Sequence, residues 1–162
     1  MNIQQEKMKA YVEAAIADFN ANEQYLVRND LSERCICAKF ATYLEKQIKQ
    51  SEFSDYVVDV EYNRGYMGKE HTIKRLYGRN IVVDLIVHKR GFDQRTGFNN
   101  LICIEMKKGY KRLEYSNDKE RLRALTGKYN GFRYLAGFMI EVFANKRADA
   151  FGLRIDEEFY MN

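Results

Sequence analysis

The chain has 162 residues, of which 46% are hydrophobic and 31% are charged, and a formal net charge of +4. This length supports one hydrophobic core, and this composition excludes an intrinsically disordered chain. No apolar stretch is long enough to span a membrane, the polar N-terminus lacks a signal-peptide pattern, and the three cysteines lack zinc-site spacing. We therefore expect one domain over residues 1–162, located in the cytoplasm, without membrane contact and with reduced thiols.

Two helices are predicted in the N-terminal third of the chain. Residues 3–19 carry apolar side chains at helical spacing, and residues 20–29 form a polar connector. A second helix is predicted from Asp30 to about Gln50. It begins with a capping-box pattern, because Glu33 follows Asp30 at the required spacing.

A strand is predicted over Tyr56–Arg64. One face of this strand is apolar, whereas Asp59 and Glu61 lie on a mostly polar face, which is typical of a strand near the edge of a sheet. These two acids belong either to a solvated strand face, which we favour, or to a functional site. The loop or hairpin over residues 65–79 mixes basic and tyrosine side chains, which suits either a nucleic acid or solvent.

Two apolar runs, Ile81–Val87 and Leu101–Met106, form the centre of the predicted fold. Side chains alternate along each run, and both faces are largely apolar, which is typical of strands in a sheet that is covered on both sides. Asp84 interrupts the first run and Glu105 interrupts the second, and Lys107 follows on the face of Glu105. A buried carboxylate is costly unless it is paired or binds a metal ion, so these residues are candidates for a functional site.

The C-terminal part of the chain supplies a helix and further strands. A helix capped by Ser116 or Asn117 is predicted to extend to Gly131. A strand over Phe132–Ala144 follows, Ala150–Ile155 can add a last strand, and the C-terminal tail is expected to be peripheral. The order of elements predicts an α/β (mixed α+β) fold with a central mixed sheet of four or five strands flanked by helices.

The spacing of Asp84 and the Glu105-x-Lys107 sequence resembles the catalytic motif of the PD-(D/E)xK nuclease superfamily. Members of this superfamily share a restriction-endonuclease-like fold with a helix, three strands, a helix and a strand in succession. The resemblance covers a core of about residues 30–142 and leaves residues 1–29 as an N-terminal helical extension.

The resemblance implies a catalytic metal site. Asp84 and Glu105 would bind Mg2+ or Mn2+, the backbone carbonyl of Met106 would be a further ligand, and Lys107 would be the catalytic lysine. Such a hard cation takes oxygen ligands and often only one or two carboxylates. Glu33 is a candidate to complete the site, because family members often carry an acid on this helix. The alternative is that Glu33 caps its own helix.

The expected function is therefore that of a metal-dependent nuclease that hydrolyses phosphodiester bonds, with DNA preferred to RNA as the expected substrate. The mildly basic charge permits a polyanionic partner. Many members of the superfamily act as dimers, so a homodimer is a further expectation, with the amphipathic N-terminal helix as a candidate interface. The candidates for nucleic-acid contact are the basic residues that follow the motif, Lys108, Lys111, Arg112 and Arg121.

Two alternatives remain open at the level of the sequence. Val83 precedes Asp84 where the family motif often has proline, which is compatible with a catalytically silent, nuclease-like module that binds nucleic acid or a protein partner in a defence or mobile-element system. Asp84 and Lys107 could instead form a buried ion pair with Glu105 incidental. His88 is expected to be a polar residue at a strand end rather than a metal ligand.

Overall fold

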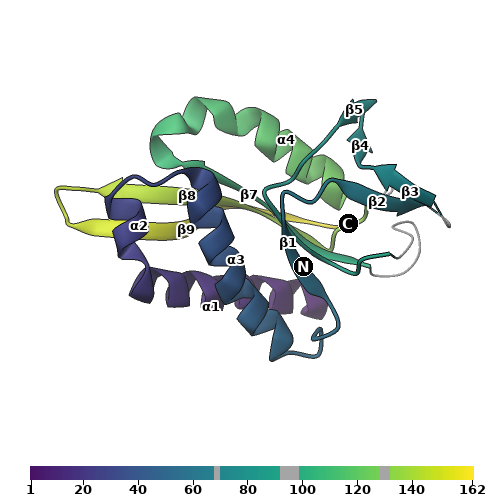
Figure 1. Cartoon of the computed structure of the whole chain (residues 1–162), viewed down its shortest axis with the longest axis horizontal. Helices are drawn as coiled ribbons and strands as arrows, with labels where there is room; N and C mark the ends of the chain where they lie inside the picture. Colours follow the sequence, from purple (N-terminus) through teal and green to yellow (C-terminus); the bar gives the residue numbers. More distant parts are fainter. Residues whose placement is uncertain (68–69, 92–98, 128–131) are drawn as a thin grey trace.

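The computed structural model describes residues 1–67, 70–91, 99–127 and 132–162, which form an α/β fold with a five-stranded mixed sheet flanked by helices (Figure 1). The strands are ordered β1-β6-β7-β8-β9, with β7 and β8 parallel and the other neighbours antiparallel. This confirms the predicted α/β class and the edge position of the first strand. The bounds of the strands are β1 Val57–Val60, β6 Leu85–His88, β7 Asn100–Lys108, β8 Ala136–Asn145 and β9 Ala150–Tyr160.

Helices cover both faces of the sheet (Figure 1). One face packs against α1 (Ile3–Asn22), α2 (Gln24–Arg28) and α3 (Glu33–Lys49), and the other packs against α4 (Tyr115–Thr126). A 3-10 helix, η1 (Gly109–Glu114), joins β7 to α4. The two apolar faces of the central strands therefore each have a helical layer to pack against.

Helix α1 belongs to the core of the domain. Its Met8, Val12, Ala15 and Phe19 are fully buried, and Phe19 packs edge to face against Phe40 of α3. Burial of a large apolar side chain contributes about 1.5–3 kcal/mol, so this helix adds substantially to the stability of the fold. Its apolar stripe is occupied within the chain, and a homodimer interface on the exposed residues of this helix stays a prediction.

The start of α3 differs from the prediction. The cap is Ser32, whose hydroxyl accepts a hydrogen bond from the backbone N–H of Cys35 at 3.2 Å. Asp30 has a φ of 54° and lies outside the helix, so the predicted capping box of Asp30 and Glu33 is wrong. The predicted polar connector over residues 20–29 contains the end of α1 and the short helix α2.

The C-terminal tail is part of the sheet rather than peripheral. Strand β9 continues to Tyr160, where the prediction ended at Ile155, and it pairs with β8 along its length. Its acidic segment faces cations of α4, because Lys119 lies 2.7 Å from Asp156. The backbone carbonyl of Met161 also accepts a hydrogen bond of 2.7 Å from the Gln5 side chain of α1. The C-terminal tail thus contacts helices on both faces of the sheet.

Helix α4 is shorter than predicted. It begins at Tyr115, before the two predicted caps, and ends at Thr126. The expected end at Gly131 lies outside the described residues. Leu122 and Leu125 are fully buried, as the predicted stripe requires.

Two small hairpins connect β1 to β6 and confirm the predicted hairpin region. They consist of β2 (Arg64–Met67) with β3 (Glu70–Ile73), and β4 (Arg75–Leu76) with β5 (Arg79–Asn80). Strand β1 is shorter than predicted, because the chain turns at Glu61, whose φ is 52°. None of the described helices combines the length and the apolar composition needed to cross a bilayer.

Candidate active site

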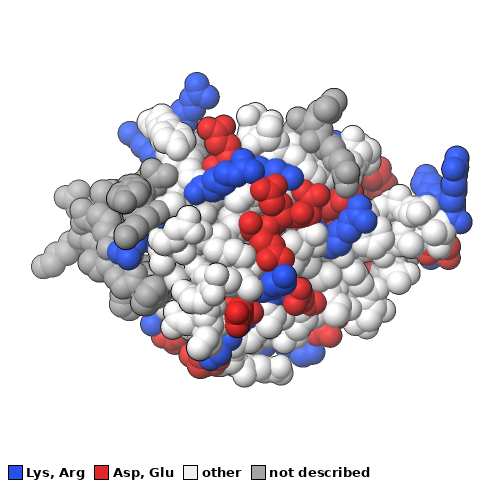
Figure 2. All heavy atoms as spheres, turned by 180° about the vertical axis from the view of Figure 1, so that it is seen from behind, with Lys and Arg blue, Asp and Glu red and all other residues white. Residues whose placement is uncertain are grey.

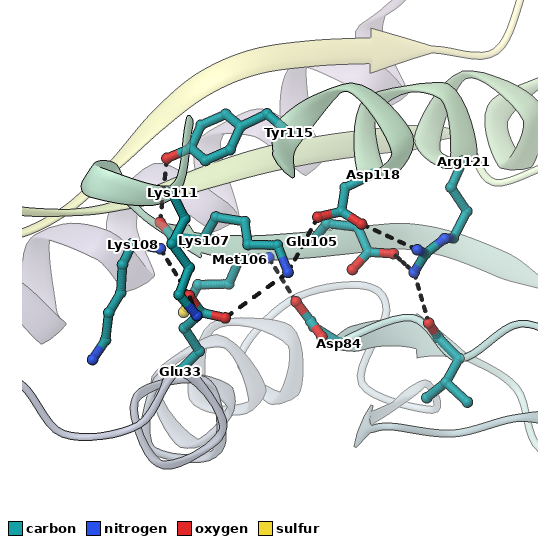
Figure 3. A network of polar contacts seen from close by, with 11 residues as sticks. Glu33, Asp84, Glu105, Met106, Lys107, Lys108, Lys111, Tyr115, Asp118 and Arg121 are labelled. Carbon is teal, nitrogen blue, oxygen red and sulfur yellow. Dashed lines mark hydrogen bonds and ion pairs between the residues drawn. The ribbon is translucent and has the colours of Figure 1, made fainter. Parts of the chain in front are cut away.

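Asp84 and Glu105 lie side by side where β6 begins (Figure 3). The antiparallel register pairs Leu85 with Ile104, which places Asp84 next to Glu105 on the neighbouring strand. A carboxylate oxygen of Asp84 accepts a hydrogen bond from the backbone N–H of Met106 at 2.8 Å. The Glu105 side chain is only 3% exposed. Strand pairing therefore brings together the two acids that interrupt the apolar runs.

The environment of these two carboxyl groups disfavours two negative charges. Burial raises the pKa of Glu105 well above its usual value, and the charge of Asp84 raises it further. Burial also raises the pKa of Asp84, although the N–H of Met106 acts in the opposite direction. The interaction between the two carboxyl groups lowers the pKa of Asp84 and raises the pKa of Glu105. A bound cation would remove this mutual repulsion.

Lys107 lies beside this pair and contacts acids from two helices. Its Nζ is 3.4 Å from Oδ2 of Asp118 and 3.9 Å from Oε2 of Glu33. Burial lowers the pKa of Lys107, but the nearby carboxylates outweigh burial and leave the pKa raised, so the side chain is charged. Its ion-pair partners are these two acids, so the alternative of a simple pair with Asp84 is not what the structure shows.

Glu33 reaches from the first turn of α3 to the end of β7. Its Oε1 accepts a hydrogen bond of 3.1 Å from the backbone N–H of Lys108 and lies 3.2 Å from Nζ of Lys111. The alternative that Glu33 caps its own helix is therefore wrong, since Ser32 performs that role. Glu33 instead lies at the edge of the group formed by Asp84, Glu105 and Lys107 (Figure 3).

Asp118 is a member of the site that was not predicted from the sequence. It lies in the first turn of α4 and is 6% exposed. Its Oδ1 accepts a hydrogen bond of 3.0 Å from Arg121, while the buried Oδ2 has no hydrogen-bond partner among the described residues and has Lys107 at 3.4 Å. An acid in the first turn of a helix already has a local explanation, because it stabilises the helix dipole. Its position beside Asp84 and Glu105 could therefore not be predicted from the sequence.

Arg121 lies over Glu105 from the same helix. One of its nitrogens donates a hydrogen bond of 2.6 Å to Oε1 of Glu105 and one of 3.0 Å to the backbone carbonyl of Val82. The guanidinium thus compensates part of the buried negative charge. The sequence indicated Arg121 for contact with phosphate, and in the structure it contacts acids of the site.

The other candidates for nucleic-acid contact are also close to acids. Nζ of Lys108 lies 2.6 Å from a carboxylate oxygen of Asp30, and Lys111 contacts Glu33. The side chain of Arg112 lies outside the described residues. Contact of these residues with nucleic acid remains a prediction.

The acids of β1 lie apart from this group. Asp59 accepts a hydrogen bond from Arg90 and lies 2.8 Å from Nε2 of His88, and its side chain is 13% exposed. The expectation of a solvated strand face is therefore wrong for Asp59. Glu61 forms an ion pair of 2.8 Å with Arg34 at the surface. His88 is the last residue of β6, as expected for a polar residue at a strand end.

Comparisons of the chain with protein-family models, with curated proteins and with solved structures find no match. A function for the chain is therefore inferred from its own residues and their geometry.

The oxygen atoms of the site suit a hard divalent cation. The N–H of Met106 points to Asp84, and in an extended strand the carbonyl of the same residue points to the same side. Asp84, Glu105 and the Met106 carbonyl together fit the preference of Mg2+ or Mn2+ for oxygen ligands. The described residues contain no group of three or more His, Cys, Asp or Glu side chains arranged for a metal ion. An ion held by these oxygens would complete its coordination with water and substrate oxygens, as Mg2+ commonly does.

Proposed function

We propose that the chain is a metal-dependent nuclease of the PD-(D/E)xK type, which hydrolyses phosphodiester bonds and acts on DNA in preference to RNA. The observation that carries this proposal is the convergence of Asp84, Glu105 and Lys107 at one point of the sheet. Two adjacent buried carboxylates are unfavourable without a cation, and this pair has an oxygen donor set suited to one.

The order of the elements supports the same proposal. Helix α3, strands β1, β6 and β7 of the central sheet, helix α4 and strand β8 occur in this order in the chain, with the hairpins β2–β3 and β4–β5 inserted between β1 and β6 and η1 between β7 and α4. This is the succession of a helix, three strands, a helix and a strand that a restriction-endonuclease-like core requires. Helix α1 and strand β9 would be additions to that core.

The residues have distinct roles in the proposed chemistry. Asp84, Glu105 and the Met106 carbonyl would hold Mg2+ or Mn2+, which when bound neutralises charge on the phosphate and lowers the pKa of water. Lys107 would hold the scissile phosphate or the attacking water, since its charged amine lies beside the two carboxylates. Asp118 and Glu33 keep Lys107 charged and oriented.

Cleavage assays with Mn2+ or Mg2+ test this proposal. We expect wild-type protein to cut labelled DNA, and Asp84→Asn and Lys107→Ala variants to lose this activity. Asp55→Asn is a matched control, because Asp55 is 62% exposed and pairs with Lys89 away from the site. Equal cleavage by the Asp84→Asn variant and the wild type would refute the proposal.

A second candidate function is a catalytically silent module that binds nucleic acid or a protein. It is favoured because basic residues of the chain already neutralise acids of the site: Arg121 contacts Glu105, and Lys107 contacts Asp118. Figure 2 likewise shows acidic side chains gathered on one face of the molecule with lysine and arginine beside them. Salt-dependent binding to nucleic acid without a metal-dependent product would favour this second function.

A further inference from the structure

A groove of about 780 Å³ lies at the end of β7, next to the candidate active site. It is bounded by the residues before α3, by the start of η1 and by the turn between β8 and β9. Buried apolar side chains of Val27, Ile36 and Val142 contribute to its lining. The groove has the volume of a site for a small ligand or for part of a chain.

The lining of the groove has a surplus of positive charge. Lys108 is paired with Asp30, and Arg154 is paired with Glu141. Two exposed cations of the β8–β9 turn, Lys146 and Arg147, have no acidic group within ion-pair distance in the part of the chain that the structure describes. Lys146 is close enough to Asp30 to lower the pKa of that carboxyl, and the lining still has more positive than negative groups, so it can attract an anionic ligand.

An exposed aromatic ring accompanies these cations. Tyr110 lines the groove and is 72% exposed, and Nζ of Lys108 lies 5.8 Å from the centre of its ring. A positively charged groove with an accessible aromatic ring is the combination that binds single-stranded nucleic acid, because phosphates contact the cations and a base stacks on the ring. Paired bases inside a duplex have no free face for such stacking.

The groove and the candidate active site lie on opposite sides of the same strand end. Lys107 projects to the side of Glu105, whereas Lys108 projects to the side of α3 and lines the groove. Glu33 connects the two, since it contacts both residues. The groove thus begins at the residue next to Lys107 in the chain.

We propose that this groove binds a single-stranded segment of the nucleic-acid substrate, with a base stacked on Tyr110 and phosphates on Lys146 and Arg147. The proposal rests on the proposed nuclease function and specifies its substrate as a nucleic acid with an unpaired segment beside the cleavage site.

Fluorescence anisotropy with a labelled oligothymidylate in EDTA tests the groove without any cleavage. We expect the Lys146→Ala/Arg147→Ala variant to bind more weakly and to reduce the slope of log Kd against log salt by about 1.4, since each phosphate contact on a single strand contributes roughly 0.7. Tyr110→Ala should weaken binding about fivefold or more, and Tyr110→Phe should retain it. These side chains are exposed, and thermal unfolding of each variant verifies an intact fold.

A Lys7→Ala/Lys46→Ala variant is the matched control, because it removes the same charge from exposed positions outside the groove. Oligothymidylate binding that is the same in wild type, in the groove variants and in this control would overturn the proposal. Equal loss in the control and groove variants, or a blunt duplex bound as tightly as the single strand, would also overturn it.

The groove proposal and the nuclease proposal are refuted by different results. If wild type cuts DNA while the groove variants bind oligothymidylate normally, the groove proposal is wrong and the nuclease function stands. If the groove variants lose binding while wild type cuts no nucleic acid with Mn2+ or Mg2+, the groove binds single strands and the nuclease function is wrong.

Discussion

The guanidinium of Arg121 lies 2.6 Å from Oε1 of Glu105, the carboxylate that would hold a metal ion. The same guanidinium also donates to Asp118 at 3.0 Å. The guanidinium thus binds one of the carboxylate oxygens that are proposed as ligands for Mg2+ or Mn2+. Metal ion and arginine would therefore compete for Glu105, and this competition has measurable consequences.

Removal of the arginine charge should tighten metal binding. We expect Arg121→Gln to raise the affinity for Mn2+ about tenfold, because one charged hydrogen bond no longer opposes the ion. Calorimetric titration measures this change. Arg123→Gln is the control, since Arg123 lies on the same helix and contacts Glu157 at 2.9 Å instead. Unchanged or weaker Mn2+ binding by Arg121→Gln would contradict the competition.

The raised pKa of Glu105 should make the stability of the protein depend on pH. Glutamate in the unfolded chain loses its proton near its ordinary pKa of 4.5, whereas the folded protein retains the proton to higher pH. The folded state then binds more protons than the unfolded state, so this group reduces the free energy of unfolding as pH rises above about 4.5. Glu105→Gln should remove this decrease.

Denaturant titrations of wild type and Glu105→Gln over a series of pH values measure the effect. The difference in free energy of unfolding between variant and wild type should shift in favour of the variant as pH increases. A difference that is constant with pH would show that Glu105 titrates normally in the fold.

Lys107 should act in catalysis and not in metal binding. We expect Lys107→Met to lower the cleavage rate at least about a hundredfold, since loss of one group that stabilises transition-state charge has an effect of this order. Mn2+ affinity should not fall, because Lys107 repels the ion. Lys119→Met is a control of the same chemistry, because Lys119 contacts Asp156 and Glu157 at the surface of α4. Normal cleavage by Lys107→Met would exclude this role.

A buried lysine outside the site predicts a separate pH effect. Lys74 is 1% exposed, donates a hydrogen bond of 2.6 Å to the hydroxyl of Tyr134, and has its pKa lowered to about 8 by burial. Between about pH 8 and 10.5 the unfolded state keeps this proton and the folded state has lost it, so stability rises with pH.

The rise should be on the order of 2 kcal/mol for a pKa difference of this size. Comparison of Lys74→Met with wild type between pH 7 and pH 10 separates this rise in the free energy of unfolding from the effect of tyrosine titration, which both proteins share. A free-energy difference between the two proteins that stays constant over this interval would be evidence against a lowered pKa.

The proximity of Asp84, Glu105 and Lys107 could be predicted from the sequence, because the relevant information is local. Two apolar runs separated by a turn-rich connector pair as antiparallel neighbours, and alternation places Lys107 on the face of Glu105. The contacts of Asp118 and Arg121 could not be predicted in this way. They depend on how α4 packs across the sheet, which no periodicity of its own residues specifies.

The errors in the predicted fold have similar causes. Asp30 and Ser32 are both good helix caps, and the choice between them depends on the turn of the backbone at Asp30. The acidic residues near Asp156 resemble a solvated tail, but they face cations of α4 that are distant in the sequence. Local patterns therefore predicted the types of element better than their ends.

The metal site is tested most directly by calorimetric titration of Mn2+ in the presence of a phosphorothioate oligonucleotide that resists cleavage and supplies phosphate oxygens. We predict saturable binding to the wild type and to the Asp55→Asn control, and loss of that binding in Asp84→Asn/Glu105→Gln. Absence of saturable binding to wild-type protein, or equal binding by the double variant, would contradict a metal-dependent nuclease built on these two carboxylates.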